Sequence, residues 1–170
     1  PDGRSIWGFA DKILFQYDVV AQAMISTPYF ADPTLGPRSI SVSADGTHAA
    51  LGWWVMDLDL NFPRIYADFG QALGSLSRGG HAVDGLRNLV YSEVPTGDGD
   101  APVLTVRDLD NLTLRERLQL SEHLAGRGVL TADGKTMYAV SDSGVMVLPV
   151  GSRDQYPRLE STVEDLLFAG

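Results

Sequence analysis

The chain has 170 residues, and its 13 lysines and arginines against 22 aspartates and glutamates give a formal net charge of −9. This acidic balance excludes a general nucleic-acid binder, because such a protein needs a positive field to displace phosphate counterions. Hydrophobic residues make up 44% of the chain, cysteine is absent, and no apolar run is long enough to span a bilayer. The composition therefore predicts a globular chain that forms a core without disulfides, thiolate metal sites or membrane insertion.

The first residues, Pro1 to Arg4, have the composition of a turn. A secretory signal would instead begin with a basic segment followed by an apolar run, so no signal peptide is predicted in these residues. Because a domain rarely starts inside a turn, we expect the chain to be a fragment of a longer protein.

Four Asp-Gly pairs recur along the chain, and each is followed within a few residues by an apolar run typical of a β-strand. They begin at Asp2, Asp45, Asp84 and Asp133, at spacings of 43, 39 and 49 residues. The glycine supplies the positive φ that a two-residue hairpin turn requires, so each unit is predicted to be strand, tight turn, strand. The strand before the turn is visible in the last three units, at 38–43, 79–83 and 126–131. The first unit lacks it.

Further strands follow the hairpin. The third strand ends near Asp18 and Pro149, each 16 residues after its Asp-Gly aspartate, and near Asp108 in the third unit, where the acidic loop 96–101 enlarges the spacing. A fourth strand is clearest over Leu112–Leu120, because apolar and polar residues alternate there, with Glu116 as the exception. A short helix over Leu112–Leu124 is the alternative, since leucine, glutamate, arginine and glutamine favour helices.

Four strands recurring every 40 to 50 residues match the blade of a β-propeller. The motifs support this: the Asp-Gly turn, the strand Tyr138–Ser141, strands ending at Asp18 and Asp108, and the turn Asn111–Leu114. Residues 1–150 resemble the YVTN-type, WD40-like propeller repeats of bacterial secreted and surface-layer proteins. The segment 60–70 departs from the pattern.

The resemblance implies an all-β fold, with blades of four antiparallel strands in an incomplete ring of about four blades. The blades are expected at approximately 1–37, 38–78, 79–125 and 126–150, with 151–170 as an exit strand or a linker toward a following domain. An open β-sandwich is the alternative architecture. We expect a helical content below about a quarter by circular dichroism, because more would approach the average of mixed domains.

The function implied by the resemblance is a non-catalytic binding or scaffold module of a larger secreted or surface propeller protein. Its location would be extracellular or at the cell surface, and its ligand would be a protein or a small molecule. The alternative is a propeller enzyme of the lactonase or quinone-dehydrogenase type whose site lies outside this chain. No cofactor and no catalytic residue is predicted, because the sequence has no GxSxG motif and no cofactor fingerprint.

The histidines His48, His81 and His123 show neither HxH nor HExxH spacing, so no metal site is predicted from them. Asp98 and Asp100 stand in an acidic, glycine-rich loop that suits calcium, yet the loop lacks the bidentate glutamate of an EF-hand. A solvated hairpin loop is the favoured interpretation of these two residues, with calcium binding as the alternative.

Other distinctive residues have structural interpretations. Gly79-Gly80 is expected to begin an innermost strand, where backbones crowd, and Ser77–His81 lacks the context of a nucleophile elbow. Trp53-Trp54 is expected to pack between blades, with stacking on a sugar or peptide as the alternative. The remaining carboxylates near strand ends are expected to cap turns; they are Asp57, Asp59, Asp68 and Asp108.

Packing of each blade on its neighbours predicts two groups of apolar residues. Those expected to be largely buried are Ile40, Val42, Leu89, Tyr91, Val103, Leu104, Val129, Met137, Tyr138 and Val147. Those expected to face water in part, because the first blade lacks its opening strand, are Ile6, Trp7, Phe9, Ile13 and Phe15. Exposed apolar sheet faces favour association. We therefore expect self-association that completes the propeller from two halves, or a missing upstream segment that covers these residues.

Overall fold

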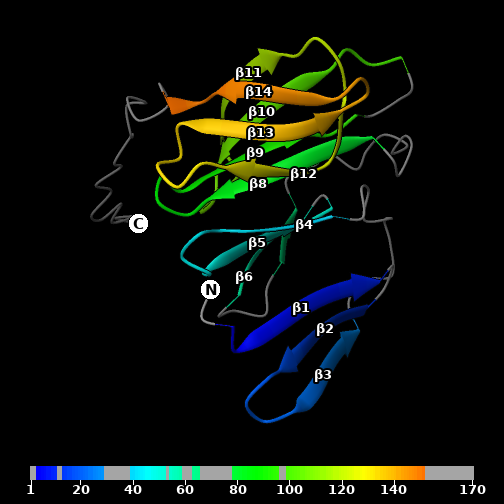
Figure 1. Ribbon diagram of the computed structural model, residues 1–170, viewed down its shortest axis with the longest axis vertical. Helices are drawn as coiled ribbons and strands as arrows, with labels where there is room; N and C mark the ends of the chain where they lie inside the picture. The colour runs from blue at the N-terminus through cyan, green and yellow to red at the C-terminus, as the bar shows by residue number, and fades with distance from the viewer. Residues whose placement is uncertain are drawn as a thin grey trace, which may run out of the picture.

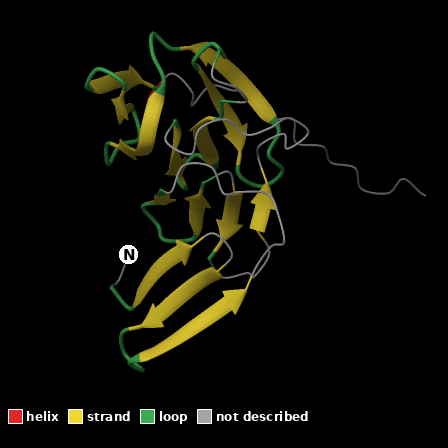
Figure 2. Ribbon diagram, turned by 90° about the vertical axis from the view of Figure 1, so that its right-hand side faces the viewer, coloured by secondary structure: helices red, strands yellow, loops and turns green. Residues whose placement is uncertain are grey.

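The computed structural model describes residues 3–10, 13–28, 39–52, 54–58, 63–65, 78–95 and 99–151. Its regular elements in these ranges are β-strands, grouped in three sheets that follow one another in chain order from one end of the molecule to the other (Figures 1 and 2). Nowhere in these ranges is there a helix with the length and apolar character that a membrane crossing demands. The prediction of an all-β chain is confirmed.

The first two sheets are antiparallel and keep the strands in chain order. The first contains β1 (Ser5–Ala10), β2 (Ile13–Asp18) and β3 (Ala23–Pro28). The second contains β4 (Ile40–Val42), β5 (His48–Leu51), β6 (Trp54–Asp57) and β7 (Pro63–Ile65). Each sheet is one blade, and we call them blade 1 and blade 2.

The third sheet joins two blades, in the strand order β11-β10-β9-β8-β12-β13-β14. Blade 3 consists of β8 (Gly79–Asp84), β9 (Leu89–Glu93), β10 (Val103–Asp108) and β11 (Leu114–Gln119). Blade 4 consists of β12 (Leu124–Leu130), β13 (Thr136–Ser141) and β14 (Val145–Pro149). The strand predicted within Leu112–Leu120 is confirmed as β11, and the helix alternative is wrong.

The innermost strands β8 and β12 run parallel and pair directly, which makes one curled sheet of the two blades. Gly80 lies opposite Gly126, and a Cβ atom at Gly80 would collide with the carbonyl oxygen of Gly126. Gly126 itself has a φ of +97°, which other residues rarely adopt. Glycine at these positions therefore permits the two backbones to approach, and the expectation that Gly79-Gly80 begins an innermost strand is confirmed.

The Asp-Gly hairpins have longer loops than the predicted two-residue turn. The amide of Ser43 bonds the carbonyl of His48, which leaves a four-residue loop, and Gly46 closes an inner turn on Ser43. The Asp45 carboxylate accepts a hydrogen bond from the amide of Thr47 at 3.1 Å. The Asp133 loop repeats this arrangement. The aspartate thus caps the loop, and the glycine supplies the positive φ, +76° at Gly46, after it.

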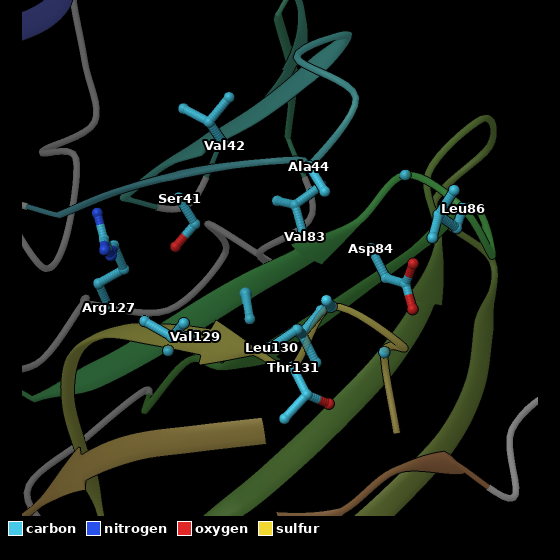
Figure 3. Close-up of a pocket in the computed structure, with 15 residues that line it drawn as sticks. Ser41, Val42, Ala44, Val83, Asp84, Leu86, Arg127, Val129, Leu130 and Thr131 are labelled. Carbon is cyan, nitrogen blue, oxygen red and sulfur yellow. The ribbon is translucent and has the colours of Figure 1, made fainter. Parts of the chain in front are cut away.

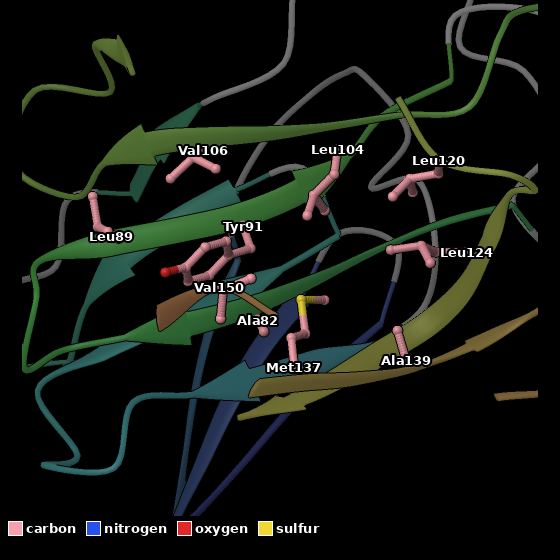
Figure 4. Close-up of a cluster of buried hydrophobic side chains, with 10 residues drawn as sticks. All are labelled: Ala82, Leu89, Tyr91, Leu104, Val106, Leu120, Leu124, Met137, Ala139 and Val150. Carbon is pink, nitrogen blue, oxygen red and sulfur yellow. The ribbon is translucent and has the colours of Figure 1, made fainter. Parts of the chain in front are cut away.

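Among the described residues, the largest apolar cluster lies between blades 3 and 4, where side chains from both blades meet inside the curled sheet (Figure 4). Its buried residues are Ala82, Leu89, Tyr91, Leu104, Val106, Leu120, Leu124, Met137, Ala139 and Val150. A smaller cluster joins blades 2 and 3, formed by Ala50, Val55, Val83, Val90 and Leu109. A third lies on the other side of blade 2 and contains Ala49, Leu51 and Met56.

The predicted burial is confirmed for some of the ten apolar residues and wrong for others. Leu89, Tyr91, Leu104 and Met137 are buried, as predicted, and Ile40 and Val103 are half-buried. The prediction is wrong for four residues with exposed fractions of 43 to 57%: Val42, Val129, Tyr138 and Val147. The last three lie side by side in register across β12, β13 and β14. Alternation turns them away from the core between blades 3 and 4. On that side Val129 lies near Val42 of β4, and all three side chains keep 45 to 57% of their surface exposed.

Five exposed residues form this surface, which we call the open face of blade 4: Val129, Tyr138, Val140, Val145 and Val147. In blade 1, Ile6 is 58% exposed and Trp7 and Phe15 are half-buried, in agreement with the expectation. The side chains of Phe9 and Ile13 lie outside the described residues. Residues 152–170 also lie outside them, so the blade boundaries and the exit segment stay predictions.

Candidate functional site: a groove along the innermost strands

A cavity of about 320 Å³ crosses the innermost strands of blades 2, 3 and 4 (Figure 3). Small residues line most of it, because three backbones converge there. Its lining residues are Ser41, Val42 and Ala44 near β4, Ala82 to Leu86 on β8 and its loop, and Arg127 to Ala132 with Gly134 on β12 and its loop. We call this cavity the inner groove.

The loop end of the inner groove is fixed by one arginine. Arg87 donates from Nη1 to the Asp84 carboxylate at 3.0 Å and from Nη2 to the carbonyl of Asp133 at 2.9 Å. Asp84 is buried, so its carboxylate needs a compensating charge, and the Arg87 guanidinium supplies it. Arg87 therefore ties the hairpin loop of blade 3 to that of blade 4.

A second cavity, of about 780 Å³, lies between blade 1 and blade 2. Its lining residues are Gly3, Ser5, Ile6, Trp7 and Gln16 from blade 1, Ile40, Val42, Asp45, Gly46 and Leu58 from blade 2, and Arg127 from blade 4. We call it the outer slot. It shares Val42 and Arg127 with the inner groove, so the two cavities meet at these side chains.

Arg127 supplies the positive charge at this meeting point. Its side chain is exposed, and none of the ion pairs found within the described ranges includes it. Apolar side chains with exposed surface stand beside it, among them Val42 and Val129. The arrangement suits a ligand with apolar groups and a carboxylate.

His81 stands apart from both cavities and connects blade 3 to blade 2. Ser41 Oγ donates to the His81 carbonyl at 2.8 Å, so its single proton is used. Nδ1 of the His81 ring lies 2.7 Å from Ser41 Oγ, so Nδ1 must be the donor to this hydroxyl oxygen. Nε2 is left to accept from Ser39 Oγ at 3.1 Å. Complete burial lowers the pKa of His81 to about 4, so the ring is neutral at pH 7.

A second polar contact lies at the strand ends opposite the Asp-Gly loops. Glu93, which is buried, accepts from the Leu124 amide and from Nδ1 of His123, both at 2.5 Å. Burial raises the pKa of Glu93 above its usual range, although both hydrogen bonds oppose that shift. These contacts attach the end of β9 to the start of β12.

The predicted histidines do not converge. His48 begins β5 and contacts Thr47 Oγ1, His81 is at the interface with blade 2, and His123 pairs with Glu93. Within the ranges that the structure describes, no group of three or more histidine, aspartate or glutamate side chains is arranged to hold a metal ion.

The other singled-out residues are distributed as follows. Asp100 is half-buried and Asp98 lies outside the described residues, so calcium binding stays a prediction. Trp54 is buried in β6, as expected for packing, while Trp53 lies outside the described residues.

Among the carboxylates expected to cap turns, Asp108 is confirmed, because its Oδ1 accepts from the amide of Asp110 at 3.0 Å. The Arg115 guanidinium holds its other oxygen at 2.9 Å. Burial opposes ionisation of Asp108, but this contact and the turn amides outweigh it and lower the pKa of the carboxyl. Asp57 ends β6, whereas Asp59 and Asp68 lie outside the described residues.

Sequence reasoning missed the two cavities and Arg127. The available signal was an arginine within a strand of otherwise small and apolar residues, at the position that follows Gly126. Its importance depends on the approach of blade 4 to blades 1 and 2, which no local pattern encodes.

Comparisons with known proteins identify the fold. No protein-family model and no curated protein sequence matches the chain. Among solved structures, U3-55K, a WD40 propeller, is 14% identical with a TM-score of 0.54, over 88% of this chain and 49% of that one. The C-terminal WD40 domain of Sif2 is also 14% identical, over 90% of this chain and 66% of that domain, with a TM-score of 0.34. The chain thus spans about half the length of U3-55K, and its fold is an incomplete β-propeller.

Proposed function

We propose that the chain is a non-catalytic binding or scaffold module within a larger β-propeller protein, and that the inner groove receives a segment of a protein partner. The observation that carries the proposal is the joined pair of cavities, where exposed apolar side chains surround the unpaired guanidinium of Arg127 within the described residues. WD40 propellers typically bind proteins, which supports this class of partner.

The proposal includes a bacterial secreted or surface protein of the YVTN type. Its support is the set of repeat motifs in the sequence, above all the Asp-Gly loops and Tyr138–Ser141. An epitope-tagged form in the native host tests it. Protease added to intact cells should remove the tag if the protein is on the surface, and a tag that is protected until lysis would contradict that location.

Binding is tested by selecting peptides from a random library displayed on phage against the immobilised chain, then measuring each selected peptide by fluorescence anisotropy. Leu86 lines the inner groove and is 68% exposed, so Leu86→Glu should fold normally and weaken binding at least tenfold.

Val20→Glu is the matched control, because Val20 is 76% exposed in the β2–β3 turn and lines neither cavity. It should leave the dissociation constant within about twofold, as expected for a surface change that removes no contact. Equal loss in both variants, or no selected peptide that depends on Leu86, would contradict the proposed groove.

A further inference from the structure

Blade 1 differs from the other blades at its innermost position. In blades 2, 3 and 4 the strand before the Asp-Gly loop, β4, β8 or β12, pairs antiparallel with the strand after it. β1 follows the first Asp-Gly pair, and Gly3 has the positive φ of Gly46 and Gly134. β1 is thus the equivalent of β5, β9 and β13. Among the described strands it pairs only with β2, so one backbone edge of β1 has no described strand beside it.

The outer slot runs along this same edge. Three consecutive residues of β1, Ser5, Ile6 and Trp7, line it. Successive side chains of a strand point to opposite faces, so a cavity that reaches all three passes along the strand's edge. It also extends over the face that carries Gln16 of β2, the register partner of Trp7. Ile40 and Val42 of β4 form its opposite wall. Its 780 Å³ is within the range of about 300 to 1,000 Å³ of ligand sites.

The residues that line the outer slot indicate which class of ligand it would bind. An edge strand offers unpaired amides and carbonyls that pair with an extended chain. Trp7 and Val42 provide apolar contacts for alternate side chains, and Arg127 provides a positive charge that is exposed and outside the ion pairs of the described ranges. The complementary segment is extended, carries apolar residues at every second position and includes a carboxylate.

We propose that the outer slot accepts an extended strand from a partner chain, which pairs antiparallel with the free edge of β1 and occupies the place that β4, β8 and β12 hold in their own blades. This inference deepens the proposed function, on which it rests, by assigning strand addition as the mode of binding and a second site next to the inner groove. The partner segment has alternating apolar residues and a carboxylate that meets Arg127.

The chain's own innermost strand supplies the probe. A fluorescent peptide with the sequence of residues 38–46, RSISVSADG, has the required alternation and one aspartate. We expect it to bind the folded chain with a micromolar dissociation constant. The same peptide with proline in place of its valine cannot donate that ladder hydrogen bond, and it should bind at least tenfold more weakly.

Three protein variants locate the peptide. Ile6→Glu changes a slot residue that is 58% exposed, and it should weaken the peptide about tenfold. Arg127→Glu should weaken it several-fold, more at low salt than at high salt, because an exposed ion pair is screened. Val20→Glu, in the same blade but outside the slot, should leave affinity within about twofold. Equal losses in all three would contradict the slot.

Hydrogen exchange identifies the paired edge. The amides of β1 should gain protection when the peptide binds. β14 is the internal comparison, because it is another end strand with exposed apolar residues and pairs only with β13 among the described strands. Protection of β14 instead of β1 would overturn the proposal.

The outcome also separates this inference from the proposed function. If RSISVSADG fails to bind while phage-selected peptides bind in a Leu86-dependent manner, the strand slot is wrong and the binding module stands. If neither class of peptide binds, both are wrong.

Discussion

The junction between blades 3 and 4 and the junction between blades 2 and 3 are built from the same repeat by different means. At the first, β8 and β12 pair through their backbones, and ten buried residues fill the space behind them. At the second, β4 and β8 belong to separate sheets, five buried residues pack between them, and His81 bonds to two serines.

A few side chains account for the difference. Glycine at 80 and 126 permits direct contact of two backbones, whereas Ser39 and Ser41 carry hydroxyls that need a polar partner when buried. The histidine satisfies both hydroxyls. The comparison teaches that a repeat can keep its strand order while one junction combines backbone pairing with a large apolar cluster and the other combines a smaller cluster with a buried histidine that must stay neutral.

Matched leucine truncations test the apolar contrast. Leu104 and Leu109 are both almost fully buried, the first in the large cluster and the second in the small one. Each Leu→Ala change should destabilise the fold by about 2 to 5 kcal/mol, with Leu104→Ala at the upper end, because more large neighbours surround the cavity it leaves. Urea denaturation followed by fluorescence measures both. A larger loss for Leu109→Ala would contradict the ranking of the two junctions.

The polar junction should be sensitive to acid. The pKa of His81 is about 4 in the fold against 6.5 for the free side chain, so the unfolded chain binds the proton first as pH falls. Above pH 6.5 the ring has no effect. Between pH 6.5 and 4 the free energy of unfolding should drop by up to about 3 kcal/mol, at 1.36 kcal/mol per pH unit. Glu93, with its raised pKa, acts in the opposite direction.

Urea titrations from pH 7 to 4 check this loss. His81→Gln removes the titrating group and should flatten the dependence, although it lowers stability at pH 7 because the serine contacts change. His48→Gln is the control, since His48 is half-buried and remote from Ser39 and Ser41 in its contacts, and it should keep the wild-type slope. An unchanged slope in His81→Gln would rule out this histidine as the origin.

The backbone contact of β8 and β12 can be broken by a single methyl group. Gly80→Ala places a Cβ atom against the Gly126 carbonyl, and the pair can separate only by moving two strands. Overpacking of this kind should cost about 1 to 3 kcal/mol. Gly144→Ala is the control, because a Cβ atom there meets nothing within 4 Å. Equal stability of both variants would show that the parallel contact is not tight.

Strand positions could be predicted from the sequence because their determinants are local. The Asp-Gly loops and the alternation in Leu114–Gln119 need only neighbouring residues, and both placed strands correctly. Burial could not be predicted in the same way. Met137 and Tyr138 are adjacent and both apolar, yet one is fully buried and the other 45% exposed. Only the presence or absence of a neighbouring sheet separates them.

Less of the candidate site than of the fold could be predicted from the sequence. The sequence distinguished Gly79-Gly80 and the histidines, but both cavities bring together β4 and β12, whose lining residues Val42 and Arg127 are 85 positions apart. Arg127 lines both cavities only because β12 lies beside β8 and near β4. Long-range register of this kind has no local signal.

The open face of blade 4 is a third surface for comparison, because among the described residues no further blade follows blade 4 to pack on it. Val129, Tyr138 and Val147 are aligned across three strands and 45 to 57% exposed, on the side where another blade would pack. Sheets that stack face to face hide such rows at about 10 Å separation. We therefore expect the chain to self-associate through this face at micromolar concentration.

Charge on the open face tests the association. The double variant Tyr138→Lys, Val147→Lys replaces exposed side chains, so its free energy of unfolding should change by less than about 0.5 kcal/mol per site in the monomer. Two lysines from facing copies would repel and would lose water on contact, so light scattering should show a shift toward the 18.4 kDa monomer. Val20→Lys, outside this face, should leave the assembly unchanged. A wild-type chain that is already monomeric at these concentrations would show that this face stays in water, and that its apolar row does not by itself form the missing junction.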